Sequence, residues 1–182
     1  MARVPEITTQ DQLPVEQHAI FEEIAESRGR VSGPFPVLLN SPEMAIQVAR
    51  LGHHVRFEHH FEPWFYEIVV LAVAREWDCL FEWAAHAPAA AKAGVHPDVI
   101  SAIEQRRAPA GLGEQETLIV RFVQELLREH RVSQQVYDAV DAWLGNAGVV
   151  ELAATVGYYS LLACVMDATE VQPPTGAPVL PA

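Results

Sequence analysis

The chain has 182 residues, of which half are hydrophobic and a fifth are charged. This length is typical of one domain, and the composition is typical of a folded globular protein and not of a disordered one. The formal net charge of −12 argues against nucleic acid or an anionic membrane as a partner, because binding phosphates requires a clustered excess of basic side chains.

The apolar stretches and the two cysteines indicate where in the cell the protein is expected. The longest uncharged apolar stretch, residues 68–74, is far shorter than the roughly 20 residues of a membrane-spanning helix. The N-terminal sequence lacks the apolar run of a secretory signal, and we therefore expect a cytoplasmic protein. Cys79 and Cys164 lie far apart in a chain long enough to fold without a disulfide, and so any role of either thiol is expected to be chemical.

The N-terminal third predicts an extended arm followed by two helices. Residues 1–14 contain two prolines and no hydrophobic period. Residues 15–28 have helical spacing and stop at Gly29, after which a loop rich in Gly, Ser and Pro follows. Ser41 can cap a second helix that begins at Pro42 and ends near residue 52. On this helix we expect three side chains to face inward: Met44, Val48 and Leu51.

The central third predicts two further helices. Pro63 can begin the first, and Asp78 is a plausible N-cap of the second, which would place Cys79 in its first turn. Pro88 lies inside the second helix and removes one backbone donor. We therefore expect a kink just after His86.

The last third predicts helices within residues 96–107, 113–130, 134–145 and 148–169. The final helix is apolar on most sides and is expected to be buried on more than one face. Residues 172–182 are too rich in proline for a helix and should form a tail. The predicted fold class is all-α, with about seven helices in a single compact domain over residues 15–171.

The centre of the chain places three reactive side chains in apolar surroundings. Cys79, Glu82 and His86 are separated by steps of three and four residues and therefore share one face of a helix. In one interpretation, Glu82 and His86 are a surface pair and Cys79 is a small core residue. In the other, burial tunes an acid/base histidine close to a thiol that the helix dipole activates.

Glu67 lies twelve positions before Cys79, within the apolar sequence WFYEIVVLAVA. An unpaired carboxylate is costly in such surroundings. If the two helices pack antiparallel, Glu67 can reach His86 and orient it. The alternative is that Glu67 lies at the solvent edge of its helix.

The pattern of Glu67, Cys79, Glu82 and His86 resembles the central motif of the carboxymuconolactone decarboxylase and alkylhydroperoxidase D-like superfamily. In its thiol peroxidase branch the motif is Glu, eleven residues, then Cys-x-x-Cys-x-x-x-His, and here Glu82 replaces the second cysteine. The sequence FEWAAH is similar to the Glu-Trp-x-x-His motif of the decarboxylase-like branch. The similarity covers roughly residues 21–171.

This resemblance implies a compact alkylhydroperoxidase D-like helical bundle whose subunits assemble as trimers or hexamers. In the decarboxylase branch, the substrate is a carboxylated muconolactone from aromatic catabolism, which loses carbon dioxide. The resemblance assigns His86 as proton donor or acceptor, and assigns Glu82 and Glu67 as the groups that set its charge and orientation. We therefore expect a homo-oligomeric lyase, or a related proton-transfer enzyme, that acts on a small molecule.

Two alternatives stay open. The first is a thiol-dependent hydroperoxidase that uses Cys79, although a two-cysteine cycle is disfavoured because Cys164 is the only other thiol. The second is a non-catalytic oligomeric binding protein of the same fold.

An anionic substrate would need a cationic anchor, because the net charge of the protein repels it. Arg30, Arg56 and Arg75 are the candidates, and each could instead be a solvated surface residue. Four histidines within eight positions could bind zinc or nickel, but no regular spacing organises them, and we expect neither a metal nor a cofactor. These histidines are His53, His54, His59 and His60.

Overall fold

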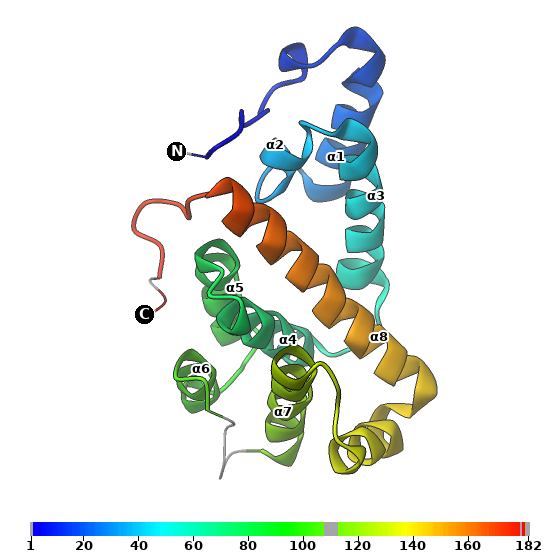
Figure 1. Cartoon of the computed structure of the whole chain (residues 1–182), viewed down its shortest axis with the longest axis vertical. Helices are drawn as coiled ribbons and strands as arrows, with labels where there is room; N and C mark the ends of the chain where they lie inside the picture. The colour runs from blue at the N-terminus through cyan, green and yellow to red at the C-terminus, as the bar shows by residue number, and fades with distance from the viewer. Residues whose placement is uncertain (1, 108–112, 179, 181–182) are drawn as a thin grey trace. The chain divides into compact units, whose positions relative to one another are not determined.

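A computed structural model of the chain describes residues 2–107, 113–178 and 180. These residues form helices and their connections and contain no β-strand (Figure 1). Eight α-helices lie in this part of the chain, and all but the four-residue α2 have at least eight residues, which confirms the predicted all-α class. The helices are α1 (His18–Arg28), α2 (Phe35–Leu38), α3 (Pro42–His53), α4 (Pro63–Glu76), α5 (Leu80–Lys92), α6 (Pro97–Glu104), α7 (Glu114–Glu129) and α8 (Gln134–Thr169).

The helices group into two compact units. The first comprises Met1–His59 and Cys164–Gln172, and the second comprises His60–Ala163 and Pro173–Ala182. Helix α8 contributes its C-terminal end to the first unit and its remainder to the second.

The predicted boundaries of an arm, a single domain and a tail, at residues 14 and 171, stay predictions. The arm contains a 3-10 turn at Gln10–Gln12 (η1), and the described part of the tail contains no helix. Residues 1, 179, 181 and 182 of these segments lie outside the described residues.

In the first unit, turn-forming residues set the helix ends where the sequence predicts them. Helix α1 ends at Gly29, whose φ of 75° is a conformation that glycine adopts without steric cost. Helix α3 begins with Pro42, because the first helical residue needs no N–H donor. The predicted loop between them differs from expectation, since it contains α2. Pro36 fits there because it lies in the first turn.

The inward face of α3 also differs from the prediction. Val48 is buried, but Met44 and Leu51 are 55% and 48% exposed. The helix instead buries small side chains such as Ala45 and Ala49, and it packs against α1. A helix with apolar residues on several sides offers more than one candidate stripe, and only the packing partner decides which stripe is buried.

Helix α4 is the central helix of the second unit. Most of its residues are buried, and it packs against α5, α6 and α7. A helix that is apolar on nearly every side is stable only when other elements surround it. The side chain of Glu67, which lies in the second turn of α4, is consequently only 14% exposed.

Helix α8 consists of two helical segments that the sequence predicts separately. Gly145 divides them with φ 68° and ψ 173°, a combination that is essentially restricted to glycine. By length and composition alone, α8 is the one helix in the described ranges that could cross a membrane, which corrects the expectation that the chain has no such segment. Half of its most apolar 18-residue window is buried within the protein.

Candidate active site

Three residues, Trp77, Asp78 and Cys79, connect α4 to α5, and the two helices pack against each other. So short a connection reverses the course of the chain and brings α5 against α4. Glu67, in the second turn of α4, lies opposite His86, in the middle of α5. Because α5 begins at Leu80, Glu82 lies one helical turn before His86 on the same face.

His86 lies between two carboxylates, and we name Glu67, Glu82 and His86 the Glu–His–Glu cluster. Nδ1 of His86 is 2.8 Å from Oε2 of Glu67, within hydrogen-bonding distance. Nε2 is 3.3 Å from Oε2 of Glu82. The side chains of Glu67, Glu82 and His86 are 14%, 7% and 10% exposed. The cluster is thus in the interior, and Glu82 and His86 do not form a surface pair.

The surroundings of His86 determine its charge. Burial by itself would lower the pKa of the imidazole, but the hydrogen bonds and the negative charges of Glu67 and Glu82 outweigh burial and raise the pKa from 6.5 to about 9. His86 is therefore an imidazolium at neutral pH, with both ring N–H groups directed at carboxylates. The cluster holds a proton that a reaction can use.

Two tyrosines that sequence reasoning missed border His86. Tyr66 on α4 and Tyr159 on α8 are buried, and their hydroxyl groups hydrogen-bond to each other. Their rings lie at steep angles to the imidazole, with centroids 6.4 Å and 5.5 Å from it. Tyr66 directly precedes Glu67 in the sequence, and this position could have indicated that it lies near the site. No comparable signal exists for Tyr159, because 93 positions separate it from Tyr66.

Cys79 occupies a different position from the predicted one. It is the N-cap of α5 and not a first-turn residue, and Asp78 lies outside the helix with a φ of 53°. The backbone carbonyl of Cys79 accepts a hydrogen bond from the N–H of Trp83. The residue is fully buried, and neither it nor Cys164 forms a disulfide. Cys79 is still at the positive end of the α5 dipole, but the protein shields its thiol from solvent.

The sequence matches the carboxymuconolactone decarboxylase family over residues 42–125, a range that contains Cys79 and the whole Glu–His–Glu cluster. No curated protein matches the sequence significantly.

Solved structures with a similar fold cover nearly the whole chain. An alkylhydroperoxidase AhpD core protein from Ralstonia eutropha JMP134, described as an uncharacterized peroxidase-related protein, has a TM-score of 0.77 at 16% identity, over 96% of this chain and 93% of that one. A peroxidase-related protein from Silicibacter sp. TM1040 has a TM-score of 0.73 at 17% identity, over 96% of both chains. These identities show the fold alone.

A debrominase is a third structural relative. Debrominase Bmp8 has a TM-score of 0.72 at 13% identity, over 93% of this chain and 92% of that one. A cysteine-to-alanine variant of Bmp8 was crystallised with 2,3,4-tribromopyrrole and has a TM-score of 0.74 at 12% identity, over 96% of this chain and 95% of that one. The same fold thus occurs in proteins with different named activities.

The three candidate arginine anchors occupy different surroundings. Arg75 lies within the family match and is buried in the second unit. It donates hydrogen bonds to the carbonyl oxygen of Glu104, at 2.7 Å, and to the carboxylate of Asp78. Arg30 and Arg56 belong to the first unit and are exposed. A substrate-binding role stays a prediction for all three, and Arg75 is the weakest candidate because its guanidinium already faces protein acceptors.

The candidate histidine cluster is divided between the two units. His53 and His54 lie 3.7 Å and 2.8 Å from the carboxylate of Glu58 in the first unit. His60 lies 3.6 Å from Glu151 in the second. Within the described ranges, no group of three or more His, Cys, Asp or Glu residues is arranged to hold a metal ion.

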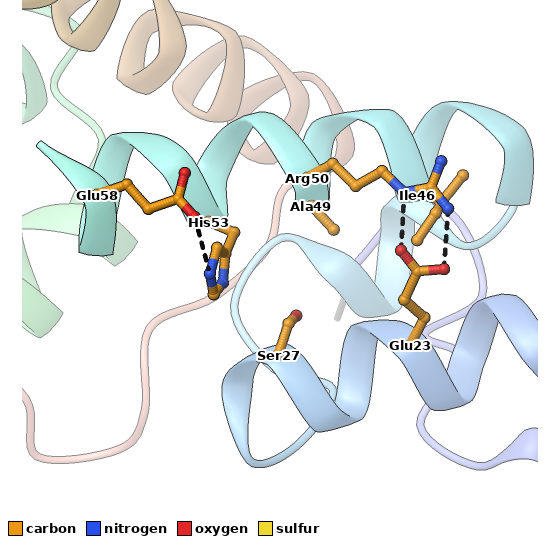
Figure 2. Close-up of a pocket in the computed structure, with 7 residues that line it drawn as sticks. All are labelled: Glu23, Ser27, Ile46, Ala49, Arg50, His53 and Glu58. Atoms are coloured by element: carbon orange, nitrogen blue, oxygen red, sulfur yellow. Dashed lines mark hydrogen bonds and ion pairs between the residues drawn. The ribbon is translucent and has the colours of Figure 1, made fainter.

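A cavity of about 360 Å³ lies between α1 and α3 in the first unit (Figure 2). Glu23 and Arg50 form a two-bonded ion pair at its edge, with distances of 2.7 and 2.9 Å. The Arg50 guanidinium lowers the pKa of Glu23, which remains a carboxylate. The cavity contains no member of the Glu–His–Glu cluster. Its lining residues are Glu23, Ser27, Ile46, Ala49, Arg50, His53 and Glu58.

Proposed function

We propose that the protein is a decarboxylase-like lyase, or a related proton-transfer enzyme, that acts on a small carboxylated lactone or a similar intermediate of aromatic catabolism. The observation that carries this proposal is the buried Glu–His–Glu cluster, in which His86 is protonated at neutral pH. The family match over residues 42–125 supports it.

The cluster has the parts that protonation after decarboxylation requires. When the carbon–carbon bond to the carboxylate breaks, its electron pair remains on the substrate as an enolate, and the carbon dioxide leaves. His86 then transfers the proton from Nε2 to the substrate, a step of the kind that general acids accelerate about 10² to 10⁴-fold. Solvent returns a proton to His86 and completes the cycle.

The two carboxylates have different tasks in this proposal. Glu67 makes the shorter contact and keeps the Nδ1 proton in place, which fixes the ring orientation. Glu82 makes the longer contact to Nε2, and this contact must break so that Nε2 can donate its proton to the substrate. We assign His86 as general acid, Glu67 as its orienting partner, and Glu82 as the group that relays the replacement proton.

The proposed setting is a cytoplasmic homo-oligomer with a small-molecule substrate and with neither nucleic acid nor membrane as a partner. The net charge of −12 supports the absence of polyanionic partners. Exposed apolar side chains such as Met44, Leu51 and Phe57 support contacts between subunits.

A thiol-dependent reaction of Cys79 is the second candidate. Its support is the position of Cys79 at the N-terminus of α5, together with the peroxidase-related proteins and the debrominase among the structural relatives. The full burial of Cys79 argues against it, because a thiolate must meet its substrate.

Two substitutions separate the candidates. We expect His86→Asn to abolish release of carbon dioxide from a panel of carboxylated lactones, while Cys79→Ser retains most of it. Consumption of organic hydroperoxides with a dithiol reductant, measured in parallel, should be negligible in every variant, and Cys164→Ser is the control for thiol loss. Turnover that requires Cys79 and survives His86→Asn would reverse the assignment.

A further inference from the structure

The turn between α4 and α5 contains an unusual residue. The N–H of Cys79 donates to the carbonyl of Ala74 at 2.8 Å, and the N–H of Asp78 donates to the carbonyl of Arg75 at 3.2 Å. These two bonds define a Schellman motif, in which the left-handed residue is usually glycine. Here that residue is Asp78, with a φ of 53°. Aspartate tolerates this conformation better than most residues, but at a cost that glycine avoids.

The same arrangement occurs at the end of α6. The N–H of Arg106 donates to the carbonyl of Ile103 at 2.8 Å, and the N–H of Arg107 donates to the carbonyl of Ala102 at 2.9 Å. Arg106 is the left-handed residue, with a φ of 56°. Two neighbouring helices of the second unit therefore both end on a non-glycine residue where glycine would be less strained.

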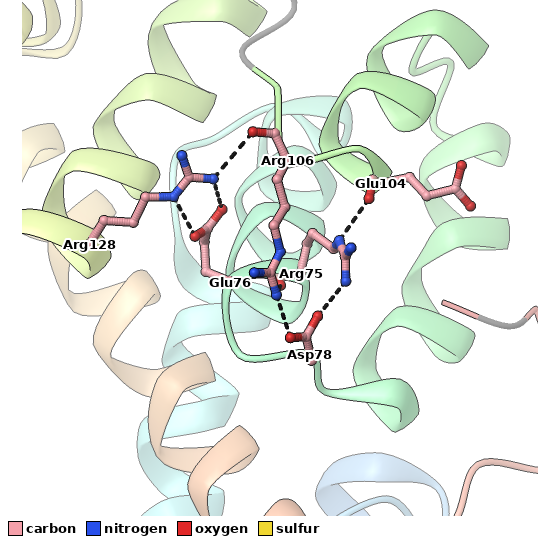
Figure 3. Close-up of polar contacts among 6 residues, drawn as sticks. All are labelled: Arg75, Glu76, Asp78, Glu104, Arg106 and Arg128. Atoms are coloured by element: carbon pink, nitrogen blue, oxygen red, sulfur yellow. Dashed lines mark hydrogen bonds and ion pairs between the residues drawn. The ribbon is translucent and has the colours of Figure 1, made fainter. Parts of the chain in front are cut away.

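The two unusual residues bind each other (Figure 3). One carboxylate oxygen of Asp78 accepts a hydrogen bond from Arg106, and the other accepts one from Arg75. Each arginine also donates a hydrogen bond to a backbone carbonyl near the end of the other helix. Arg75 of α4 donates to the carbonyl of Glu104 at the end of α6, and Arg106 donates to the carbonyl of Arg75 near the end of α4, at 3.2 Å. Cations at these positions complement the negative ends of both helix dipoles.

We propose that Asp78 is a positioning residue of the candidate active site, whose carboxylate fixes the start of α5 relative to the end of α4. A glycine would form the turn with less strain, and so what Asp78 adds is its carboxylate. This group connects the α4–α5 turn to α6 from a point directly before the first residues of α5. The turn sets the register in which Glu67 on α4 faces His86 on α5.

The consequence for catalysis rests on the proposed function, but the positioning itself can be measured without a substrate. The observable is the pH titration of His86, because its proton is held by contacts that cross from α4 to α5. A residue that only stabilises the fold would change the free energy of unfolding and leave this titration in place.

The test uses one variant, a fold-preserving alternative and a matched control. Asp78→Gly removes the carboxylate and relieves the backbone. Because it leaves the buried Arg75 with one fewer acceptor, the double variant Arg75→Met with Asp78→Gly replaces the charge by an apolar side chain of similar size, which proteins usually tolerate. The control, Arg128→Gln, removes the ion pair with Glu76 at the same corner, with distances of 2.7 and 2.6 Å, and a hydrogen bond to the carbonyl of Arg106 at 3.3 Å. It keeps the carboxylate of Asp78 and both arginines that donate to it.

NMR titration of the His86 ring gives the result. In both Asp78 variants we expect the midpoint to fall by about one pH unit, because a weaker contact with Glu67 holds the proton less tightly. In Arg128→Gln it should remain at the wild-type value. An unchanged midpoint in the folded double variant would overturn the proposal. A shifted midpoint in a protein that decarboxylates no lactone would support the positioning role and count only against the proposed function.

Discussion

The protonated state of His86 stabilises the folded protein, and so the free energy of unfolding should fall as the pH rises above neutral. The unfolded chain has an ordinary histidine pKa of 6.5, whereas the folded protein holds that of His86 at about 9. Below pH 6.5 both states carry the proton, and the contribution to stability is complete. Between these values only the folded state keeps it, and the free energy of unfolding falls by about 1.4 kcal/mol per pH unit, or about 3 kcal/mol in all.

The assay is urea unfolding at fixed protein concentration between pH 6 and pH 10, compared with Glu67→Gln. This variant retains Glu82 but replaces the charged acceptor of the shorter contact to His86 by a neutral amide oxygen. A hydrogen bond to a charged group contributes about 1.5 to 3 kcal/mol, and one between neutral groups about 0.5 to 1.5 kcal/mol. Its His86 pKa should therefore be one to two units lower, and its decline in stability should end at a correspondingly lower pH. The difference between the two proteins isolates His86 from the other seven histidines of the chain, which has eight in total.

The expected signature is a wild-type advantage that is complete at about pH 7 and below and shrinks between pH 7.5 and 9.5. A wild-type stability that stays flat over this range would refute the assignment of an imidazolium between two carboxylates. So would an NMR titration of His86 with a midpoint near 6.5.

Three further predictions concern other parts of the molecule. Ellman's reagent should modify one thiol rapidly in the native protein, because Cys164 is exposed and Cys79 is fully buried; Cys164→Ser should remove this fast phase, and a fast phase that persists would show that Cys79 is accessible. Gly145→Ala should lower the free energy of unfolding by about 1 to 3 kcal/mol, because alanine is strained at the backbone angles of Gly145. Gly157→Ala, at an uncrowded helical position, should instead raise it by up to about 1 kcal/mol. Equal effects of the two substitutions would contradict the break in α8. Arg128→Gln should destabilise the protein by about 1 to 3 kcal/mol because Glu76 is buried, and adding Glu76→Gln should recover part of the loss; a neutral effect of Arg128→Gln would show that this ion pair does not contribute.

The sequence by itself predicted the all-α class, most of the helices and the three residues of the Glu–His–Glu cluster. Glycine and proline have local conformational requirements, and so Gly29, Pro42 and Pro63 mark helix ends wherever the helices pack. The spacing of Cys79, Glu82 and His86 places them on one face of a helix for the same local reason.

Tertiary structure decided which of several possible contacts form. The inward stripe of α3 excludes Met44 and Leu51, because the neighbouring helix and not the period selects the buried face. Likewise, the partner of His86 became definite only once α4 and α5 were packed together. Tyr159 reaches the site from a helix that is distant in the sequence, and no local pattern encodes such a contact.

The α4–α5 turn is the clearest case in which tertiary contacts override the local preference of a residue. Residue type favours Asp78 as an N-cap, since aspartate is among the best capping residues. In the folded protein its carboxylate instead binds Arg75 and Arg106, and Cys79 becomes the N-cap. Arg75 is only three residues before Asp78, but Arg106 follows the end of α6 and is 28 positions away. The tertiary packing that brings Arg106 to Asp78 therefore completes a stronger competitor for the carboxylate than the nearby backbone N–H groups.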